Sequence, residues 1–261
     1  MLDGCYALGP AGTPGVSLWG IDLAQAPSVV AALLGRLSEA ERLRITTLEV
    51  GAARRRFIVR RSALRALVGA ATGTVPNEVA FLLGRDGKPS VAAPKGADRC
   101  HFNSSSAREV AVIAISAAGP IGIDVEWTQG TTPLDRVAAR FFSESEREAL
   151  AACPSASRRE QFFRTWVRKE AFLKGLGDGI SARIRVTRLG GAADFEAAAA
   201  VEDGWMVRDL AGLPAGYLAS VATRAGHGAQ TEPPDGGRQH HDSAGARAAD
   251  HDAGIAVQPR H

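Results

Sequence analysis

The chain has 261 residues, a formal net charge of +3 and a composition that is 45% hydrophobic and 23% charged. A chain of this length can bury one or two hydrophobic cores, and its composition is ordinary for a soluble globular protein. The net charge is too small to argue for nucleic-acid binding by itself. No apolar run approaches the length of a membrane span, and no secretory signal is evident at the N-terminus.

The three cysteines, Cys5, Cys100 and Cys153, are odd in number. Their spacing matches neither a zinc site nor a disulfide framework. We therefore expect a cytoplasmic protein in a reducing environment.

The pattern of the first half of the chain predicts a strand, then helices, then further strands. Residues 16–23 alternate between apolar and other residues, which is typical of a strand. Ser38 followed by Glu41 forms a capping box, which predicts the start of a helix. The other predictions for this half are helices at residues 27–34 and 54–71 and strands at residues 79–83, 100–103 and 110–115, the last two joined by serine-rich residues 104–106.

The second half repeats this order. Residues 121–127 alternate as a strand, and Ser143 followed by Glu146 forms a second capping box. The remaining predictions are helices at residues 134–140 and 157–176 and strands at residues 184–189, 195–201, 205–210 and 217–222.

The two halves contain an internal sequence repeat. Residues 37–42 and 142–147 match in residue type, and each segment begins a capped helix that precedes a longer arginine-rich helix. We predict an α+β protein of two similar subdomains related by pseudo-twofold symmetry, spanning residues 1–119 and 120–224. The junction of two such halves is a natural place for a ligand cleft.

Residues 225–261 differ in composition and lack apolar periodicity, which predicts a disordered tail. This tail holds five of the six histidines, so metal binding is a second interpretation, although solvated disorder fits the composition better. We assign the tail no function.

Six arginines lie close together in the predicted helix of the first half. They are Arg54, Arg55, Arg56, Arg60, Arg61 and Arg65. One interpretation is a solvated helix surface. The other is a phosphate-binding surface, because the guanidinium group of arginine can donate two parallel hydrogen bonds to phosphate oxygens.

The residues with the clearest chemistry lie at 121–127 and 166–175. Residues two apart in a strand share a face, so Asp124 and Glu126 project together. Glu170 and Lys174 are four apart in a helix and also share a face. Three carboxylates of this kind suit a hard divalent ion, Mg²⁺ most readily, with waters and substrate phosphates completing its coordination.

A simpler interpretation of the same residues is an ordinary protein surface. Asp124 and Glu126 would then be solvent-facing residues of an edge strand, and Glu170 and Lys174 a common helix pair. Arg168 and Lys169 beside them would fit an exposed face.

The motif Gly122-Ile123-Asp124-x-Glu126, followed by Trp166-x-x-Lys169-Glu170-Ala171-x-x-Lys174-Gly175, resembles the signature of the 4′-phosphopantetheinyl transferases of the larger, Sfp-type class. The resemblance covers most of residues 16–224. Its further patches are Gly87-Lys88-Pro89, Phe102-Asn103-x-Ser105, Arg61-x-x-x-Arg65 and the closing strands from Trp205 to Ala222.

The resemblance implies transfer of the phosphopantetheine arm of CoA to a serine hydroxyl of an apo acyl- or peptidyl-carrier protein, with 3′,5′-ADP as the second product. Asp124, Glu126 and Glu170 would hold Mg²⁺, and Lys174 would neutralise charge on the phosphates. Because the serine hydroxyl must lose its proton during attack, we expect Glu170, at the edge of the metal site, to act as the base, directly or through a water. The family fold also implies a monomer whose partners belong to polyketide, peptide or fatty-acid synthesis.

The resemblance also implies which residues contact CoA. These are Arg61, Lys88, Arg44, Arg85, Ser105, Ser106, Asp124 and Lys174. One departure from the family pattern is Ser106, which stands where a histidine that holds the 3′-phosphate is expected. Serine donates a hydrogen bond but carries no positive charge, so CoA affinity is either weaker or restored by the arginines. His101 comes too early in the motif to replace that histidine.

Two alternatives remain open. One is a degenerate relative that binds CoA or a carrier domain without turnover, and the intact set of Asp124, Glu126, Glu170 and Lys174 argues against it. The other is a different Mg²⁺-dependent phosphoryl-transfer enzyme, which the carboxylates alone permit and the tryptophan-containing motif disfavours.

Overall fold

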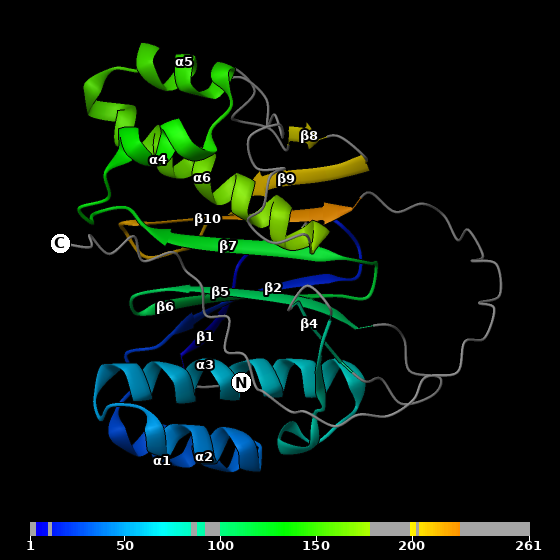
Figure 1. The fold of residues 1–261 in the computed structure, drawn as a ribbon. Coiled ribbons are helices and arrows are strands. Elements are labelled where there is room, and N and C mark those ends of the chain that lie inside the picture. Colours follow the sequence, from blue (N-terminus) through cyan, green and yellow to red (C-terminus); the bar gives the residue numbers. More distant parts are fainter. Residues whose placement is uncertain are drawn as a thin grey trace, which may run out of the picture.

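The computed structural model describes residues 4–9, 12–84, 88–91, 100–177, 199–201 and 204–224. Two four-stranded antiparallel sheets lie one above the other, and helices cover the outer side of each (Figure 1). The architecture is therefore mixed helix and sheet, as the sequence predicts.

The first sheet has the strand order β1-β2-β6-β5. Its strands are β1 (Cys5–Ala7), β2 (Val16–Asp22), β5 (His101–Ala107) and β6 (Val110–Ser116), and a separate pair is formed by β3 (Phe81–Leu83) and β4 (Pro89–Val91). The accompanying helices are α1 (Pro27–Leu33), α2 (Glu39–Thr47) and α3 (Ala52–Thr72), with the 3-10 turns η1 (Leu34–Arg36) and η2 (Pro76–Glu78). The strand β5 forms one edge of this sheet.

The second sheet has the strand order β7-β10-β9-β8, so β7 forms its edge. Its strands are β7 (Ile121–Trp127), β8 (Ala199–Val201), β9 (Trp205–Asp209) and β10 (Tyr217–Arg224). Three helices accompany it: α4 (Leu134–Phe141), α5 (Glu144–Ala152) and α6 (Ser155–Leu176).

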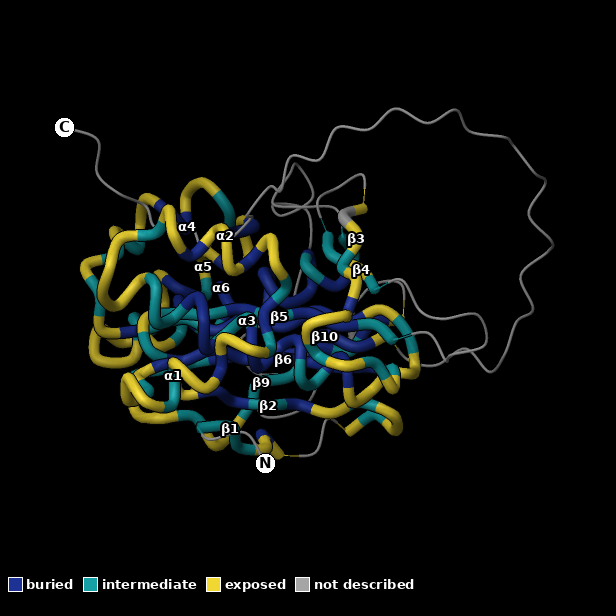
Figure 2. Tube along the Cα trace, turned by 90° about the horizontal axis from the view of Figure 1, so that it is seen from below, coloured by how far each residue is buried: buried dark blue, intermediate teal, exposed yellow. Residues whose placement is uncertain are grey.

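The central strand β6 shows why the core forms where it does. Every residue of β6 is buried, because both faces of the strand are covered (Figure 2). Val110, Val112 and Ala114 face the second sheet, where they pack with Ile121, Ile123 and Val125 of β7. The alternate residues Ala111, Ile113 and Ile115 pack under α3 instead. The uninterrupted apolar sequence of β6 thus joins two cores.

The two halves repeat each other in detail. Both capping boxes form as predicted, with Glu41 closing on Ser38 and Glu146 closing on Ser143. Each buried glutamate then pairs with the long helix that follows: Glu41 with Arg61 and Arg65 of α3, and Glu146 with Lys169 of α6. The tripeptide Gly20-Ile21-Asp22 of β2 likewise recurs as Gly122-Ile123-Asp124 of β7. The division at residues 119 and 120 itself stays a prediction.

The prediction that residues 104–106 form a connecting loop is wrong. Ser104, Ser105 and Ser106 continue strand β5, paired with Ile113, Val112 and Ala111 of β6. The turn lies at Arg108 and Glu109, where Arg108 adopts a left-handed φ of 49°. Small polar side chains favour turns by local preference, but backbone pairing with a neighbouring strand can override that preference. Here β6 supplies this pairing.

Most other predicted elements within the described residues are confirmed, apart from shifts of a few residues at their ends. The predicted strand at residues 184–189, most of that at 195–201, the tail at 225–261 and Arg85 lie outside the described residues. The three cysteines are free. In the described part of the chain no helix is both long and apolar enough to cross a membrane.

Candidate active site

The helix α6 lies directly on strand β7, and Gly122 makes this contact possible. A Cβ added at Gly122 would collide with the carbonyl of Ala171 and with the backbone nitrogen of Gly175. Because Gly122 has no side chain, the last turns of α6 approach the backbone of β7. That approach brings Glu170 and Lys174 of α6 next to Asp124 of β7.

Three side chains from three elements meet at one carboxylate oxygen. Asp124 Oδ1 accepts hydrogen bonds from Lys174 Nζ at 2.7 Å and from Ser105 Oγ at 2.8 Å. Lys174 Nζ also donates to Ser105 Oγ at 3.0 Å. Ser105 belongs to β5 of the first sheet, whereas Asp124 and Lys174 belong to the second half. The cluster therefore lies where the two halves meet.

Two carboxylate oxygens in this cluster are buried without a hydrogen-bond partner among the described residues. They are Asp124 Oδ2 and Glu170 Oε1. Asp124 is 3% exposed and Glu170 is 5% exposed, so the interpretation of these residues as surface carboxylates is wrong for both. Buried acceptors in a native protein normally have a partner, so two such oxygens in one cluster are compatible with a site for a bound ion or water.

Glu126 also faces this region, on the same side of β7 as Asp124. Its Oε1 accepts a hydrogen bond from Trp166 Nε1 at 3.1 Å. Trp166 lies one turn of α6 before Glu170 and is buried. The tryptophan of the sequence motif therefore orients one of the predicted metal ligands.

Burial and mutual repulsion change the proton affinity of these groups. Burial, followed by the charges of Asp124 and Glu126, raises the pKa of Glu170 to about 8, although Lys174 opposes the shift. Burial and Asp124 raise the pKa of Glu126 to about 7, against the opposing effects of Trp166 and Lys174. Burial lowers the pKa of Lys174, but the three carboxylates outweigh it and the net shift is upward. Full ionisation of the three carboxylates is therefore unfavourable beside a single lysine, and a bound cation would favour it.

The donor set suits Mg²⁺. As the side chains stand, the described residues contain no group of three or more His, Cys, Asp and Glu positioned to hold a metal. Mg²⁺ does not require such a cage, because proteins usually bind it through one or two carboxylates together with waters and substrate phosphates. The two orphaned oxygens, of Asp124 and Glu170, are the observation that fits such a site.

The predicted CoA contacts fall into two groups. Ser105 and Lys174 meet at Asp124, whereas Arg61 lies elsewhere, paired with Glu41 and stacked over the ring of Phe81. Lys88 Nζ donates to the carbonyl of Gly175 at 2.8 Å, at the end of α6. Burial lowers the pKa of Lys88 to about 8. Arg44 is exposed on α2, and Ser106 is half-buried on β5.

The arginine cluster is mostly tied to the protein itself. Arg55 and Arg56 bind the carboxylate of Glu109, and Arg61 and Arg65 bind that of Glu41. Contact with phosphate would therefore require these arginines to share or exchange partners.

Two features of the site are absent from the predictions. Arg168 and Lys169 are buried, paired with Asp209 and Glu146, and do not form an exposed face. Asn103 Oδ1 accepts a hydrogen bond from the backbone N–H of Ile123, the residue before Asp124. The sequence carries one signal for this contact: Asn103 precedes Ser105 by two residues in a strand and so shares its face.

Comparison with known proteins places these features in context. Residues 120–205 match the model of the 4′-phosphopantetheinyl transferase superfamily, a range that includes β7 and α6. The chain is 36% identical to the 4′-phosphopantetheinyl transferase HetI of Nostoc sp. over 166 residues, covering 64% of this chain and 70% of HetI.

Two Bacillus proteins match over shorter segments. The 4′-phosphopantetheinyl transferase psf-1 of Bacillus pumilus is 37% identical over 40% of this chain and 42% of its own length. The 4′-phosphopantetheinyl transferase Sfp of Bacillus subtilis is 33% identical over 40% of this chain and 44% of its own length. The chain thus spans less than half the length of these two relatives.

Proposed function

Because the chain belongs to the 4′-phosphopantetheinyl transferase family, we propose that it transfers the phosphopantetheine arm of CoA to a serine of an apo carrier protein. The observation that carries this proposal is the junction of Asp124, Glu170 and Lys174, with two buried carboxylate oxygens that lack partners.

In the proposed reaction, the carrier serine attacks the phosphorus of the pyrophosphate that bears the pantetheine arm. A bond forms between the serine oxygen and that phosphorus, and the bond to the 3′,5′-ADP oxygen breaks. The serine proton passes to Glu170, directly or through a water. Lys174, held by Asp124 and Ser105, stabilises the negative charge on the phosphate oxygens with its ammonium group.

Asp124 and Glu170, with Glu126 oriented by Trp166, are the residues that would hold Mg²⁺. When bound there, the ion neutralises pyrophosphate charge and stabilises the leaving group. Ser105 is proposed to act with Lys174 on the same phosphates, whereas Arg61, Lys88, Arg44, Arg85 and Ser106 are proposed to contact the nucleotide portion.

The role of Glu170 as a base can be separated from a role in binding. We expect Glu170→Gln to lower the transfer rate by about a hundredfold to ten-thousandfold, because glutamine cannot accept the serine proton. CoA binding, measured by isothermal titration calorimetry, is expected to survive, since the amide keeps one metal-binding oxygen. Full activity in this variant would remove Glu170 as the base.

Metal binding is expected to depend on pH in a defined direction. With pKa values raised to about 7 for Glu126 and about 8 for Glu170, both groups hold protons at lower pH that a divalent cation must displace. The affinity for Mg²⁺ should therefore rise with pH across roughly pH 6 to 9, with release of protons on binding.

Calorimetry in two buffers of different ionisation enthalpy measures the protons released. Glu126→Gln is the matched variant, because it removes the carboxyl group with the lower of the two pKa values and keeps Glu170, which has the higher one. A binding enthalpy that is the same in both buffers would contradict the assignment of these two carboxylates.

The activity itself is tested by its second product. CoA, MgCl₂, the protein and an apo carrier from fatty-acid, polyketide or peptide synthesis are mixed, and nucleotides are separated by anion-exchange chromatography. We expect 3′,5′-ADP to appear only when carrier and Mg²⁺ are both present. Release of 3′,5′-ADP without a carrier would indicate CoA hydrolysis instead, and no release with any carrier class would contradict the proposal.

A further inference from the structure

The edges of the two sheets meet beside the candidate active site. The strand β5 is the last strand of the first sheet and β7 is the first strand of the second. The two strands lie side by side across the interface without pairing as one sheet (Figure 1). An edge strand has backbone groups that no neighbouring strand satisfies, and burying such groups without partners is unfavourable.

At this junction, side chains from the first half bind the backbone of β7. Asn103 Oδ1 accepts from the N–H of Ile123 at 3.1 Å. Lys88 Nζ lies 3.4 Å from the carbonyl oxygen of Ile121, within hydrogen-bonding reach. Asn103 is 7% exposed and Ile123 is fully buried, so water does not substitute easily for the asparagine. The side chain of Asn103 thus serves as the missing strand partner of Ile123.

The contact between Asn103 and Ile123 lies one residue before Asp124 of the candidate active site. Asn103 and Ser105 project from the same face of β5, and they contact Ile123 and Asp124 in turn. Asn103 therefore fixes the backbone immediately before Asp124, while Ser105 contacts its carboxylate. A shift of β7 along β5 would carry Asp124 away from Ser105, which belongs to β5 and also contacts Lys174.

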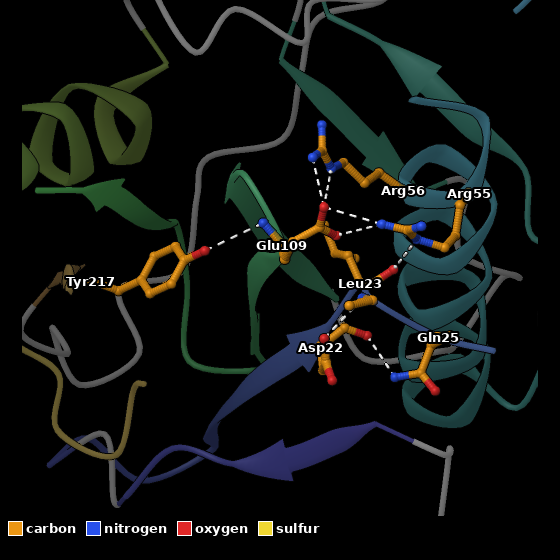
Figure 3. Close-up of polar contacts among 8 residues, drawn as sticks. Asp22, Leu23, Gln25, Arg55, Arg56, Glu109 and Tyr217 are labelled. Atoms are coloured by element: carbon orange, nitrogen blue, oxygen red, sulfur yellow. Dashed lines mark hydrogen bonds and ion pairs between the residues drawn. The ribbon is translucent and has the colours of Figure 1, made fainter. Parts of the chain in front are cut away.

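The far end of β5 is anchored as well, which makes β5 a fixed reference for β7. Figure 3 shows the carboxylate of Glu109 between the guanidinium groups of Arg55 and Arg56 of α3. The backbone N–H of Glu109 donates to the hydroxyl of Tyr217 in β10 at 3.3 Å (Figure 3). The neighbouring Arg108 lies over the ring of Trp127, the last residue of β7. These contacts hold the β5–β6 turn against both halves.

We propose that Asn103 is a positioning residue of the transferase, which sets the place of Asp124 by completing the free edge of β7. It touches no substrate atom in this role and acts through the backbone of Ile123. The inference rests on the proposed function for its effect on transfer, whereas its effect on the Ile123 amide stands independently. No substrate contact needs to change for the rate to fall, because small displacements of reacting groups reduce rates strongly.

The test compares Asn103→Leu, which keeps the approximate size but removes the acceptor, with two other variants. Asn103→Asp keeps an acceptor oxygen, and Val68→Ala removes fully buried apolar volume from the core under α3, away from β7. Hydrogen exchange at the Ile123 amide, thermal stability and carrier transfer are measured for all three. If the leucine variant does not fold, Asn103→Ser replaces it, because its hydroxyl is too short to reach Ile123.

In Asn103→Leu we expect the protection of the Ile123 amide to fall by about tenfold or more, since the amide loses its acceptor. We expect kcat to fall by about tenfold to a hundredfold, with the KM for the carrier little changed. In Asn103→Asp the protection should stay near that of the wild type. Val68→Ala should lose thermal stability while kcat stays within about twofold of the wild type.

Two results would overturn the proposal. One is unchanged Ile123 protection in Asn103→Leu, and the other is a kcat equal to that of Val68→Ala at similar thermal stability. If the wild type itself transfers nothing, the proposed function fails separately. The positioning role is then decided by the protection of the Ile123 amide, which should fall in Asn103→Leu and stay near that of the wild type in Asn103→Asp.

Discussion

Replacing Asp124 with alanine is expected to lower the rate of transfer by about a thousandfold or more. The variant loses the acceptor that holds Lys174 and Ser105, and it loses one of the two orphaned carboxylate oxygens. Both proposed contributions to catalysis, metal binding and orientation of the lysine, therefore disappear together. The fold should survive, because removing Asp124 also relieves the repulsion that raises the pKa of Glu170.

The chain supplies its own control for this variant. Asp22 occupies the same place in the repeated Gly-Ile-Asp tripeptide of the first half, but it is exposed and its Oδ1 accepts a local hydrogen bond from the N–H of Ala24. Asp22→Ala should transfer at close to the wild-type rate. Steady-state rates at saturating CoA and MgCl₂ compare the two variants, and equal activity in both would remove Asp124 from the site.

The second large effect concerns stability. Glu146→Ala is expected to lower the free energy of unfolding by about 3 to 5 kcal/mol, because it removes the carboxylate that faces a fully buried ammonium. Lys169 has no exposed surface, and its Nζ lies 2.7 and 2.9 Å from the two carboxylate oxygens of Glu146. Burial already lowers the pKa of Lys169, and Glu146 is the charge that opposes that shift. Urea unfolding measures the loss.

A double variant separates the lost pair from the lost contacts. Glu146→Leu with Lys169→Met removes both charges and keeps apolar volume, so it should recover most of the stability lost in Glu146→Ala. If the double variant is as unstable as Glu146→Ala, loss of the carboxylate beside the buried ammonium is not the cause. Since α6 carries Glu170 and Lys174, transfer activity in the double variant also shows whether the pair positions the site.

The local parts of this structure could be predicted from the sequence. The capping boxes at Ser38 and Ser143 depend on residues three positions apart, and the common face of Asp124 and Glu126 depends on strand periodicity. Glu170 and Lys174 follow from helical spacing in the same way. These patterns, read together, also predicted the convergence of Asp124 and Lys174 at one point.

What could not be predicted depends on partners far along the chain. Arg168 and Lys169 looked exposed because their partners, Asp209 and Glu146, lie 41 and 23 residues away. Serines 104–106 were assigned to a loop because their local preference is for turns, whereas pairing with β6 decides their structure. The role of Asn103 required knowing that two sheet edges meet.

We propose that Asp124, Glu170 and Lys174 form the centre that attaches phosphopantetheine to a carrier serine. The most direct test is the intact mass of an apo carrier after incubation with CoA, MgCl₂ and this protein, alongside Asp124→Ala and Asp22→Ala. We expect a mass gain of one phosphopantetheine with the wild type and with Asp22→Ala, and none with Asp124→Ala. An unmodified carrier with the wild type, or equal modification by Asp124→Ala, would contradict it.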